Sequence, residues 1–423
     1  MNKIILCVSL SLLLVCVSAL AGCLSNSSND FEAPDATYSV VTSEKNLCVK
    51  SSNEFAFDMY RELLSEGDNV FFSPYSISTA VGMAFEGAKG KTAEEILAVL
   101  DLPDDRQTRL NMTKEVQSSL NKEGTAYELN AANAYWLREG GDLEDAYKAA
   151  IVDYYLAHGE ELDFAGDPSG SVDTINKWVE DKTNGRIKDL LSTEDIVPLT
   201  YLILTNAVYF KSDWKYKFDA AATEDMDFTP ASGAAFQTPT MHMCDMDIGI
   251  NYAESDDVQM VQLPYKNEEL SMLVLLPKDG KLSTVETALN NEYVKGLKDK
   301  ISSQWMDIYL PKFKFEQKYM LKPHLSNMGM PTAFSMDADF SGITKTTELY
   351  IDSVIHQSFI EVNEEGTEAA AATAVVMAEK GGIDDEPEPM PIEFVADHPF
   401  IFLIEHKETG QILFMGKVSS PAV

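Results

Sequence analysis

The fold is decided by an apolar run in the middle of the chain, Tyr201-Leu202-Ile203-Leu204-Thr205-Asn206-Ala207-Val208-Tyr209-Phe210. Both alternating sets of its side chains are apolar, which is typical of a strand that is covered on both faces. Asn206 is the polar exception near its centre. We therefore predict that this run is a central strand of a large sheet.

Further elements are predicted on both sides of this run. Period-two patterns predict strands over 260–263, 270–276, 307–315, 354–362, 401–405 and 412–418, the last two forming a hairpin. Capping-box spacings at 51–54 and 92–95 predict the starts of two helices, and 172–180 has a helical pattern. Helices dominate the first half and strands the second, which predicts an α+β fold with a large, mostly antiparallel sheet.

The segment after the predicted strand 354–362 does not fit one secondary structure. Residues 364–377 read Glu-Glu-Gly-Thr-Glu-Ala-Ala-Ala-Ala-Thr-Ala-Val-Val-Met. Alanine favours a helix, but Gly366 breaks helices, and small residues at alternate positions also suit a strand that slides into a sheet. Residues 379–391 are dense in Gly, Pro and acid, so we predict an exposed, mobile loop there.

Five stretches in order resemble the serpin family of protease inhibitors, and the resemblance covers about residues 52–418. They are 69–78 (Asn-Val-Phe-Phe-Ser-Pro-Tyr-Ser-Ile-Ser), 205–214 (Thr-Asn-Ala-Val-Tyr-Phe-Lys-Ser-Asp-Trp), 310–313 (Leu-Pro-Lys-Phe), 364–373, and 394–402 (Phe-Val-Ala-Asp-His-Pro-Phe-Ile-Phe). The resemblance implies the serpin fold, in which helices pack around a large, mainly antiparallel central sheet. Two smaller sheets and an exposed reactive-centre loop, here at about 364–393, complete that fold.

The resemblance also implies irreversible suicide inhibition of a serine protease, by a protein that is not an enzyme and has no catalytic residues. The protease forms an acyl-enzyme with the loop, and the hinge of the loop then inserts into the main sheet and drags the protease away. This requires a metastable native state, a gap in the sheet and an insertable strand. The expected partner is a trypsin-like or subtilisin-like enzyme in a covalent complex.

Carried over position by position, the resemblance implies two groups of functional residues. The sheet-opening region consists of Ser73, Ser76, Asn206, His356, Trp214 and Lys312, and Lys312 is expected to pair with Glu364. The hinge consists of Glu364, Glu365, Gly366, Thr367, Glu368, Ala369, Ala370, Ala371, Ala372 and Thr373. Its alanine run, free of Pro and charge, resembles that of inhibitory members.

Family spacing places the reactive bond after the seventeenth residue counted from Glu364, which makes it Lys380–Gly381. A Lys there suits a protease with an acidic specificity pocket, as in trypsin-like enzymes. The loop beyond Gly381 is longer and more acidic than the family pattern. Cleavage after Glu379, Ala378, Met377 or the remote Met390 therefore stays open.

The N-terminus predicts export. An uncharged apolar stretch follows Lys3 and ends at Leu20-Ala21-Gly22-Cys23, which looks like a signal peptide (1–22) with a lipobox and a lipid on Cys23. Plain secretion and an uncleaved anchor are the alternatives. Residues 23–48 predict a flexible Ser/Asn-rich stalk, and 49–423 the folded domain. We expect an extracellular protein, held on the outer face of the membrane by the lipid alone or else secreted.

Composition limits the other partners. The chain has 423 residues with 33 Lys+Arg and 68 Asp+Glu, a formal net charge of −35, which argues against nucleic acid and anionic lipid as partners. The six histidines show no metal-ligand spacing, so we predict no metal and no cofactor. A monomer is expected. Whether Cys48 pairs with Cys244 stays open.

Two other function classes compete with the inhibitor. A non-inhibitory serpin, acting as a chaperone, carrier or structural protein, would keep the fold without the trap. A hydrolase with a triad assembled from distant residues is a weaker alternative, because no known catalytic motif occurs in the sequence.

Overall fold

The computed structural model describes residues 36–120, 127–266, 268–367 and 390–421. The chain divides into two compact units, Met1–Val41 and Thr42–Val423, and the architecture below is that of the second unit. The predicted signal peptide, Cys23 and the first part of the predicted stalk lie outside the described residues. Among the helices that are described, none is long and apolar enough to cross a membrane.

Helices come mainly from the first half of the described chain. They are α1 (Ala36–Leu63), α2 (Pro74–Phe85), α3 (Gly90–Leu100), α4 (Arg106–Leu120), α5 (Asp145–Asp153), α6 (Pro168–Lys182), α7 (Leu282–Ala288), α8 (Asn291–Lys298) and α9 (Lys322–Met328). Short 3₁₀ helices lie at Thr193–Asp195, Ala220–Ala222 and Pro331–Phe334.

The strands form two sheets. They are β1 (Val70–Phe72), β2 (Tyr127–Arg138), β3 (His158–Leu162), β4 (Leu202–Asp213), β5 (Glu224–Phe228), β6 (Phe236–Glu254), β7 (Val258–Pro264), β8 (Leu270–Pro277), β9 (Ser302–Pro311), β10 (Phe313–Met320), β11 (Ile355–Asn363), β12 (Gly366–Thr367), β13 (Ile392–Val395), β14 (Phe400–His406) and β15 (Gln411–Val418). Together with the helices they confirm the predicted α+β fold.

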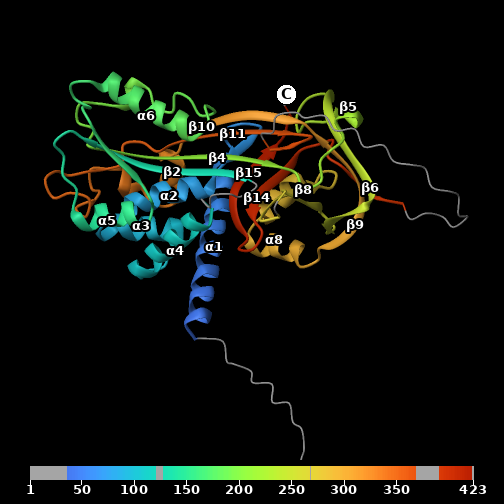
Figure 1. Ribbon diagram of the computed structural model, residues 1–423, viewed down its shortest axis with the longest axis horizontal. Coiled ribbons are helices and arrows are strands. Elements are labelled where there is room, and N and C mark those ends of the chain that lie inside the picture. The colour runs from blue at the N-terminus through green and yellow to red at the C-terminus, as the bar shows by residue number, and fades with distance from the viewer. Residues whose placement is uncertain (1–35, 121–126, 267, 368–389, 422–423) are drawn as a thin grey trace, which may run out of the picture. The chain divides into compact units, whose positions relative to one another are not determined.

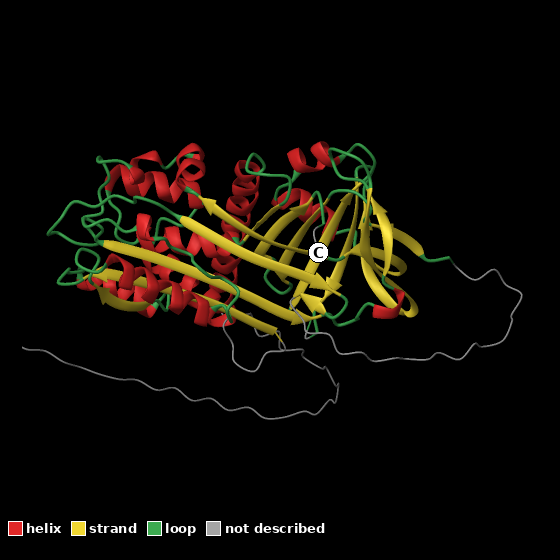
Figure 2. Ribbon diagram, turned by 90° about the horizontal axis from the view of Figure 1, so that it is seen from above, coloured by secondary structure: helices red, strands yellow, loops and turns green. Residues whose placement is uncertain are grey.

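The predicted central strand is β4, which lies inside a six-stranded sheet of order β10-β11-β12-β4-β2-β3. Helix α6 covers one face of this sheet and α2 lies against the other (Figure 1). Figure 2 shows the long strands of the sheet side by side. Leu202 and Leu204 pack into the core beside α2, whereas Ile203 packs into the core beside α6. The two apolar faces of β4 are therefore both covered, as its sequence predicts.

The other sheet has nine strands and includes the long strand β6. The first part of β6 pairs with β5 and its last part with β7, while β9 pairs along both parts across a register break between Cys244 and Gly249. The two smaller sheets of the predicted fold are thus joined through β6 and β9. The thiol of Cys244 is free and exposed.

The predicted strand 307–315 is two strands. β9 ends at Pro311, β10 begins at Phe313, and the two belong to different sheets. Pro311 has no N–H to offer a sheet ladder, and the Lys312 N–H bonds instead to the carbonyl of Pro239 at 2.9 Å. The sequence shows a continuous period-two pattern there because both segments are half-buried, and the change of sheet leaves that pattern intact.

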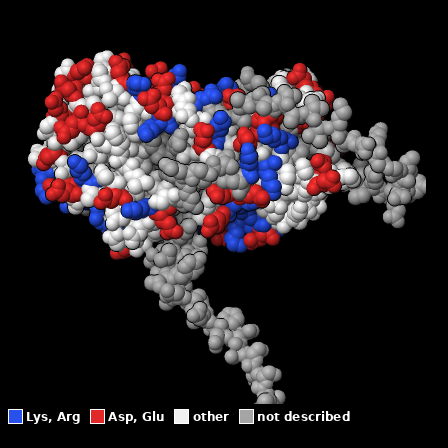
Figure 3. Space-filling model, viewed as in Figure 1, with Lys and Arg blue, Asp and Glu red and all other residues white. Residues whose placement is uncertain are grey.

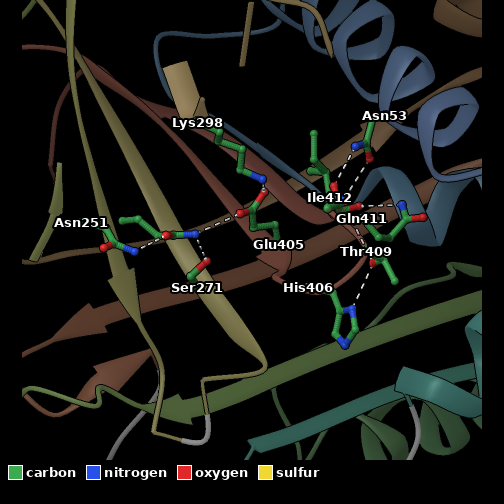
Figure 4. Close-up of polar contacts among 11 residues, drawn as sticks. Asn53, Asn251, Ser271, Lys298, Glu405, His406, Thr409, Gln411 and Ile412 are labelled. Carbon is green, nitrogen blue, oxygen red and sulfur yellow. Dashed lines mark hydrogen bonds and ion pairs between the residues drawn. The ribbon is translucent and has the colours of Figure 1, made fainter. Parts of the chain in front are cut away.

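Two capping-box predictions were wrong. Helix α1 begins at Ala36, so residues 36–48 are helical where we predicted a flexible stalk. Asn53 lies inside the spacing at 51–54 and bonds to the hairpin between β14 and β15. Its amide nitrogen donates to Gly410 O at 2.8 Å, and its oxygen accepts from Ile412 N at 2.9 Å (Figure 4).

The second motif, at 92–95, does not mark a helix start either, because α3 already begins at Gly90. Its Glu95 side chain accepts a hydrogen bond from the backbone N–H of Thr332 at 2.9 Å. In both motifs the polar side chain serves a tertiary contact.

A buried carboxylate ties α8 to the centre of the nine-stranded sheet. Glu405 on β14 is 1% exposed, and it accepts hydrogen bonds from Lys298 Nζ at 2.5 Å and from Gln262 Nε2 at 3.3 Å (Figure 4). Gln262 in turn bonds to Asn251 and Ser271. Burial raises the pKa of Glu405 although Lys298 opposes it, so this network is polar core, which must be satisfied internally.

Candidate functional site: the opening in the six-stranded sheet

The hinge enters the six-stranded sheet between β11 and β4. Gly366 and Thr367 form β12, which pairs with Val362 and Asn363 on β11 and with Ser212 and Asp213 on β4. Both pairings are antiparallel, so β4 and β11 run parallel to each other. Within the described residues, β4 and β11 are linked only through β12, which pairs with both. Below β12 the two strands are neighbours, but no backbone ladder joins them.

A cavity of about 420 Å³ lies below β12, between the lower parts of β4 and β11. Its lining includes Leu202 and Leu204 from β4, His356 from β11 and Ile77 from α2. It is bounded on the α2 side by the hydrophobic core. The six-stranded sheet therefore has an opening below β12. The facing edges of β4 and β11 are unpaired there, and the cavity lies at the same place.

The predicted polar cluster lies at this opening. Ser73 accepts from Ser76 N at 3.1 Å as the N-cap of α2, and its hydroxyl donates to Leu413 O at 2.7 Å. Ser76 Oγ bonds to the side-chain oxygen of Asn206. His356 Nε2 accepts the Ser73 N–H at 3.0 Å. The N-terminus of α2 thus connects Asn206 on β4 with His356 on β11.

Sequence reasoning missed one member of this cluster. Asn133 on β2 accepts a hydrogen bond from the Asn206 amide and donates to Tyr155 O at 2.6 Å, and it is 3% exposed. The cross-strand register pairs Asn133 with Asn206 directly. Two asparagines facing each other across an apolar sheet become visible only when the strand pairing is known.

His356 is uncharged in this environment. Its side chain is buried, and burial lowers the pKa of its imidazole to about 3. The neutral ring can therefore accept the Ser73 N–H through Nε2, which leaves its proton on Nδ1. A charged histidine here would cost desolvation energy, because burial disfavours the charged form.

The upper end of the opening is built around Trp214. Its indole N–H donates to Asn363 O at 3.0 Å, and its ring stacks on Tyr265 with 4.7 Å between centroids. The Tyr265 hydroxyl lies 2.7 Å from Thr367 Oγ1, and both residues are buried. Trp214 was predicted at this position, whereas Tyr265 was missed because its sequence context is that of an ordinary strand end.

Two ion pairs hold the hinge carboxylates. The predicted pair is present, with Lys312 Nζ 3.0 Å from Glu364 Oε2, and Thr223 Oγ1 also donates to Glu364 at 2.8 Å. A second pair joins Lys217 to Glu365. Burial raises the pKa of Glu364, but hydrogen bonds from its own backbone, Lys312 and Thr223 outweigh this, so its pKa lies below the usual value. Partly exposed pairs of this kind contribute about 0–1 kcal/mol each.

Gly366 is required by close packing. A Cβ at this position would lie 2.1 Å from Ser212 O and 2.7 Å from Asp213 Cα, both on β4. Any side chain would therefore push β12 away from its neighbour. The remaining hinge residues from Glu368 to Thr373, and the predicted reactive bond Lys380–Gly381, lie outside the described residues.

Comparison with known proteins identifies the family. The family model described as "Serpin (serine protease inhibitor)" matches residues 50–421. An uncharacterized serpin-like protein of Thermococcus kodakarensis is 44% identical over 88% of this chain and 85% of its own length. Human Serpin B8 is 39% identical over 89% of this chain and 99% of its own length. The crystal structure of Serpin48, "a highly specific serpin in the insect Tenebrio molitor", superposes with a TM-score of 0.77, at 32% identity, over 89% of this chain and 98% of that one.

The chain therefore belongs to the serpin family and has the serpin fold. The members of this family are generally protease inhibitors and not enzymes.

Proposed function

We propose that this chain is an irreversible suicide inhibitor of serine proteases. The observation that carries the proposal is the opening itself: β12 already occupies the top of a slot between β4 and β11, and the strand edges below it are unpaired. A chain cleaved in its loop can extend β12 downward as a full strand. The acyl-linked protease then moves with the loop before the ester is hydrolysed.

The register of β12 supports this extension. Gly366 faces Asp213 on β4 and Asn363 on β11. Continuing both registers by seven residues sets Thr373 opposite Asn206 and His356, so a hydroxyl arrives at the polar cluster. The side chain of Thr367 is buried, and every second residue shares its face. In an inserted strand, Val375 and Met377 would therefore face the cavity and Glu368 would face outward.

The energy released is sufficient for the trap. Inserting about a dozen residues adds backbone hydrogen bonds on both sides, each contributing roughly 0.5–1.5 kcal/mol net. Filling the cavity with Val375 and Met377 adds apolar burial. The total is on the order of 10 kcal/mol, which drives insertion strongly.

The target and location follow from the sequence predictions. We propose cleavage at Lys380–Gly381 by a trypsin-like or subtilisin-like protease, and a lipid on Cys23 that anchors the monomeric inhibitor outside the cell. Figure 3 shows acidic side chains gathered over the end of the molecule that carries α6, with lysines interspersed elsewhere on this face. This distribution supports a protein partner rather than nucleic acid.

The test is incubation of the mature chain with trypsin, a subtilisin and an elastase, followed by denaturing electrophoresis and mass spectrometry. We expect a covalent band at the summed mass with trypsin and a released peptide that begins at Gly381. The matched control is Thr373→Arg, in which a long cation must enter the polar cluster, so cleavage should proceed without the band. Cleavage of the unaltered chain without a covalent band, with all three proteases, would establish the non-inhibitory alternative.

A further inference from the structure

We propose that β6 carries a binding site for a soft monovalent metal ion, Cu(I), formed by the side chains of His242, Cys244 and Met246. These residues occupy alternate positions of the run Met-His-Met-Cys-Asp-Met at 241–246. Thiolate and thioether sulfurs select Cu(I), and imidazole also binds copper. The site belongs to the nine-stranded sheet, where β6 pairs with β9 far from α6 (Figure 1). It is therefore separate from the opening and independent of the proposed inhibitory function.

Alternation along β6 separates core side chains from accessible ones. Met241 and Met243 are buried and belong to the hydrophobic core. The thiol of Cys244 is free and exposed, and the side chain of His242 is 29% exposed. Residues two apart on a strand point to the same face. His242 and Cys244 therefore share the outer face of β6, on the side opposite the core.

The third ligand lies in the irregular part of β6. The register against β9 breaks between Cys244 and Gly249, so the residues between them leave the regular ladder. The Asp247 N–H donates to Asp245 Oδ1 at 2.9 Å, which turns the chain directly after Cys244. Met246 lies at this turn and is 59% exposed. Its unbranched side chain has three rotatable bonds, so its sulfur can adapt to an ion that Cys244 holds.

Asp307 on β9 orients the imidazole. His242 Nε2 lies 2.7 Å from Asp307 Oδ1, and the ring stacks on Tyr309 with 4.4 Å between centroids. A metal-binding histidine usually donates its other ring N–H to a carboxylate. Because Asp307 engages Nε2, Nδ1 is the nitrogen that would coordinate the ion. Asp307 is also the residue directly opposite Cys244 in the register, so its negative charge favours a cation beside the thiol.

The ligand set favours a soft ion. Among the described residues, no three His, Cys, Asp or Glu side chains are grouped so that they could hold a metal ion. The third ligand is therefore the thioether of Met246, which favours Cu(I) over Zn²⁺. Binding replaces the thiol proton of Cys244 with Cu(I) and releases H⁺, and no oxidation state changes. Histidine spacing gives no sign of this site, because only one of its three ligands is a histidine.

The binding test is an anaerobic titration of the mature chain with Cu(I), supplied as its acetonitrile complex, in competition with the chelator bathocuproine disulfonate. We expect a single equivalent to bind, and Zn²⁺ to bind more weakly. Cys244→Ser should abolish this binding, whereas His242→Gln and Met246→Leu should each weaken it by about tenfold or more. Met336→Leu is the matched control, because Met336 is also exposed but lies outside β6, and it should bind as the unaltered chain does.

Two further measurements identify the ligands. Copper-edge X-ray absorption should show sulfur and nitrogen ligands, with the sulfur contribution reduced in Met246→Leu. Iodoacetamide should label the free thiol of Cys244, and a single equivalent of Cu(I) should block this labelling. Cys48 is another thiol of the mature chain, so Cys48→Ser should leave both results unchanged.

Three results would overturn the site. They are Cu(I) binding that survives in Cys244→Ser, binding that is equally tight in the unaltered chain, His242→Gln and Met246→Leu, and Zn²⁺ binding tighter than that of Cu(I). The second result would mean that a lone thiol takes up the ion. Melting temperatures show whether each variant is folded, and Met246→Leu changes an exposed side chain, so it remains informative if another variant fails to fold.

Discussion

The Tyr265 hydroxyl and Thr367 Oγ1 lie 2.7 Å apart in a buried contact at the top of the six-stranded sheet. Tyr265 directly follows β7, and Thr367 is the second of the two hinge residues that form β12. The contact therefore fixes the point at which the chain enters the sheet. Because Tyr265 also stacks on Trp214, the hinge is held by the same residues that define the upper end of the opening.

Tyr265→Phe should destabilise the uncleaved chain by about 1–2 kcal/mol, because it removes one hydrogen bond and leaves the Thr367 hydroxyl buried without it. Urea unfolding measures this difference. Tyr350→Phe is the control, since Tyr350 is 46% exposed, and it should change stability by less than about 0.5 kcal/mol. Equal effects of the two substitutions would mean that the Tyr265 contact contributes nothing.

Gly366→Ala should displace β12, because the new Cβ would meet Ser212 O at 2.1 Å. Hydrogen exchange should then show faster exchange at the Thr367 and Ser212 amides than in the unaltered chain. Gly296→Ala in α8 is the matched control, since a Cβ there meets nothing within 4 Å. Unchanged protection in Gly366→Ala would show that β12 tolerates a side chain.

The pair between Lys312 and Glu364 predicts a pH dependence. The pKa of Glu364 is lower in the folded chain than in the unfolded chain, so its contribution is present above the unfolded pKa and is lost as the pH falls through the folded value. Stability should therefore fall less steeply on acidification in Lys312→Met than in the unaltered chain. Urea unfolding between pH 6 and pH 3 measures the two slopes, and identical slopes would contradict the pairing.

His356 predicts a second, separate pH effect. Its pKa is lowered by burial to about 3, so the unfolded chain takes up a proton near pH 6.5 while the folded chain does not. Folded stability should therefore fall as the pH drops below about 6.5, by up to about 1.4 kcal/mol per pH unit for this group. His356→Gln retains an acceptor for Ser73 N and should remove this part of the slope. Titration of the imidazole by NMR with a midpoint near 6.5 in the folded chain would refute the expectation.

The sequence predicted the elements that carry a strong local pattern. The run that became β4 is apolar on both faces, and its burial on both sides follows directly. The sheet change at Lys312 was not predictable in the same way, because β9 and β10 continue one period-two pattern although they belong to different sheets. Asn53 and Glu95 fit a helix-start motif, but each bonds to a segment far away in the chain.

The candidate site shows the same division. Ser73, Asn206 and His356 lie in motifs that resemble the family, and they meet at the opening. Asn133 and Lys217 were missed, because the first needs the β2–β4 register and the second depends on a side chain reaching across to Glu365. Long-range pairing of this kind leaves no periodic trace in a single sequence.

The central claim is that the opening between β4 and β11 accepts the cleaved loop as a strand. The most direct measurement is the thermal unfolding temperature of the chain before and after a protease cuts the loop at Lys380–Gly381. Insertion worth on the order of 10 kcal/mol should raise this temperature by roughly 10 °C or more. An unchanged or lower unfolding temperature after complete cleavage would contradict insertion and, with it, the proposed inhibitory mechanism.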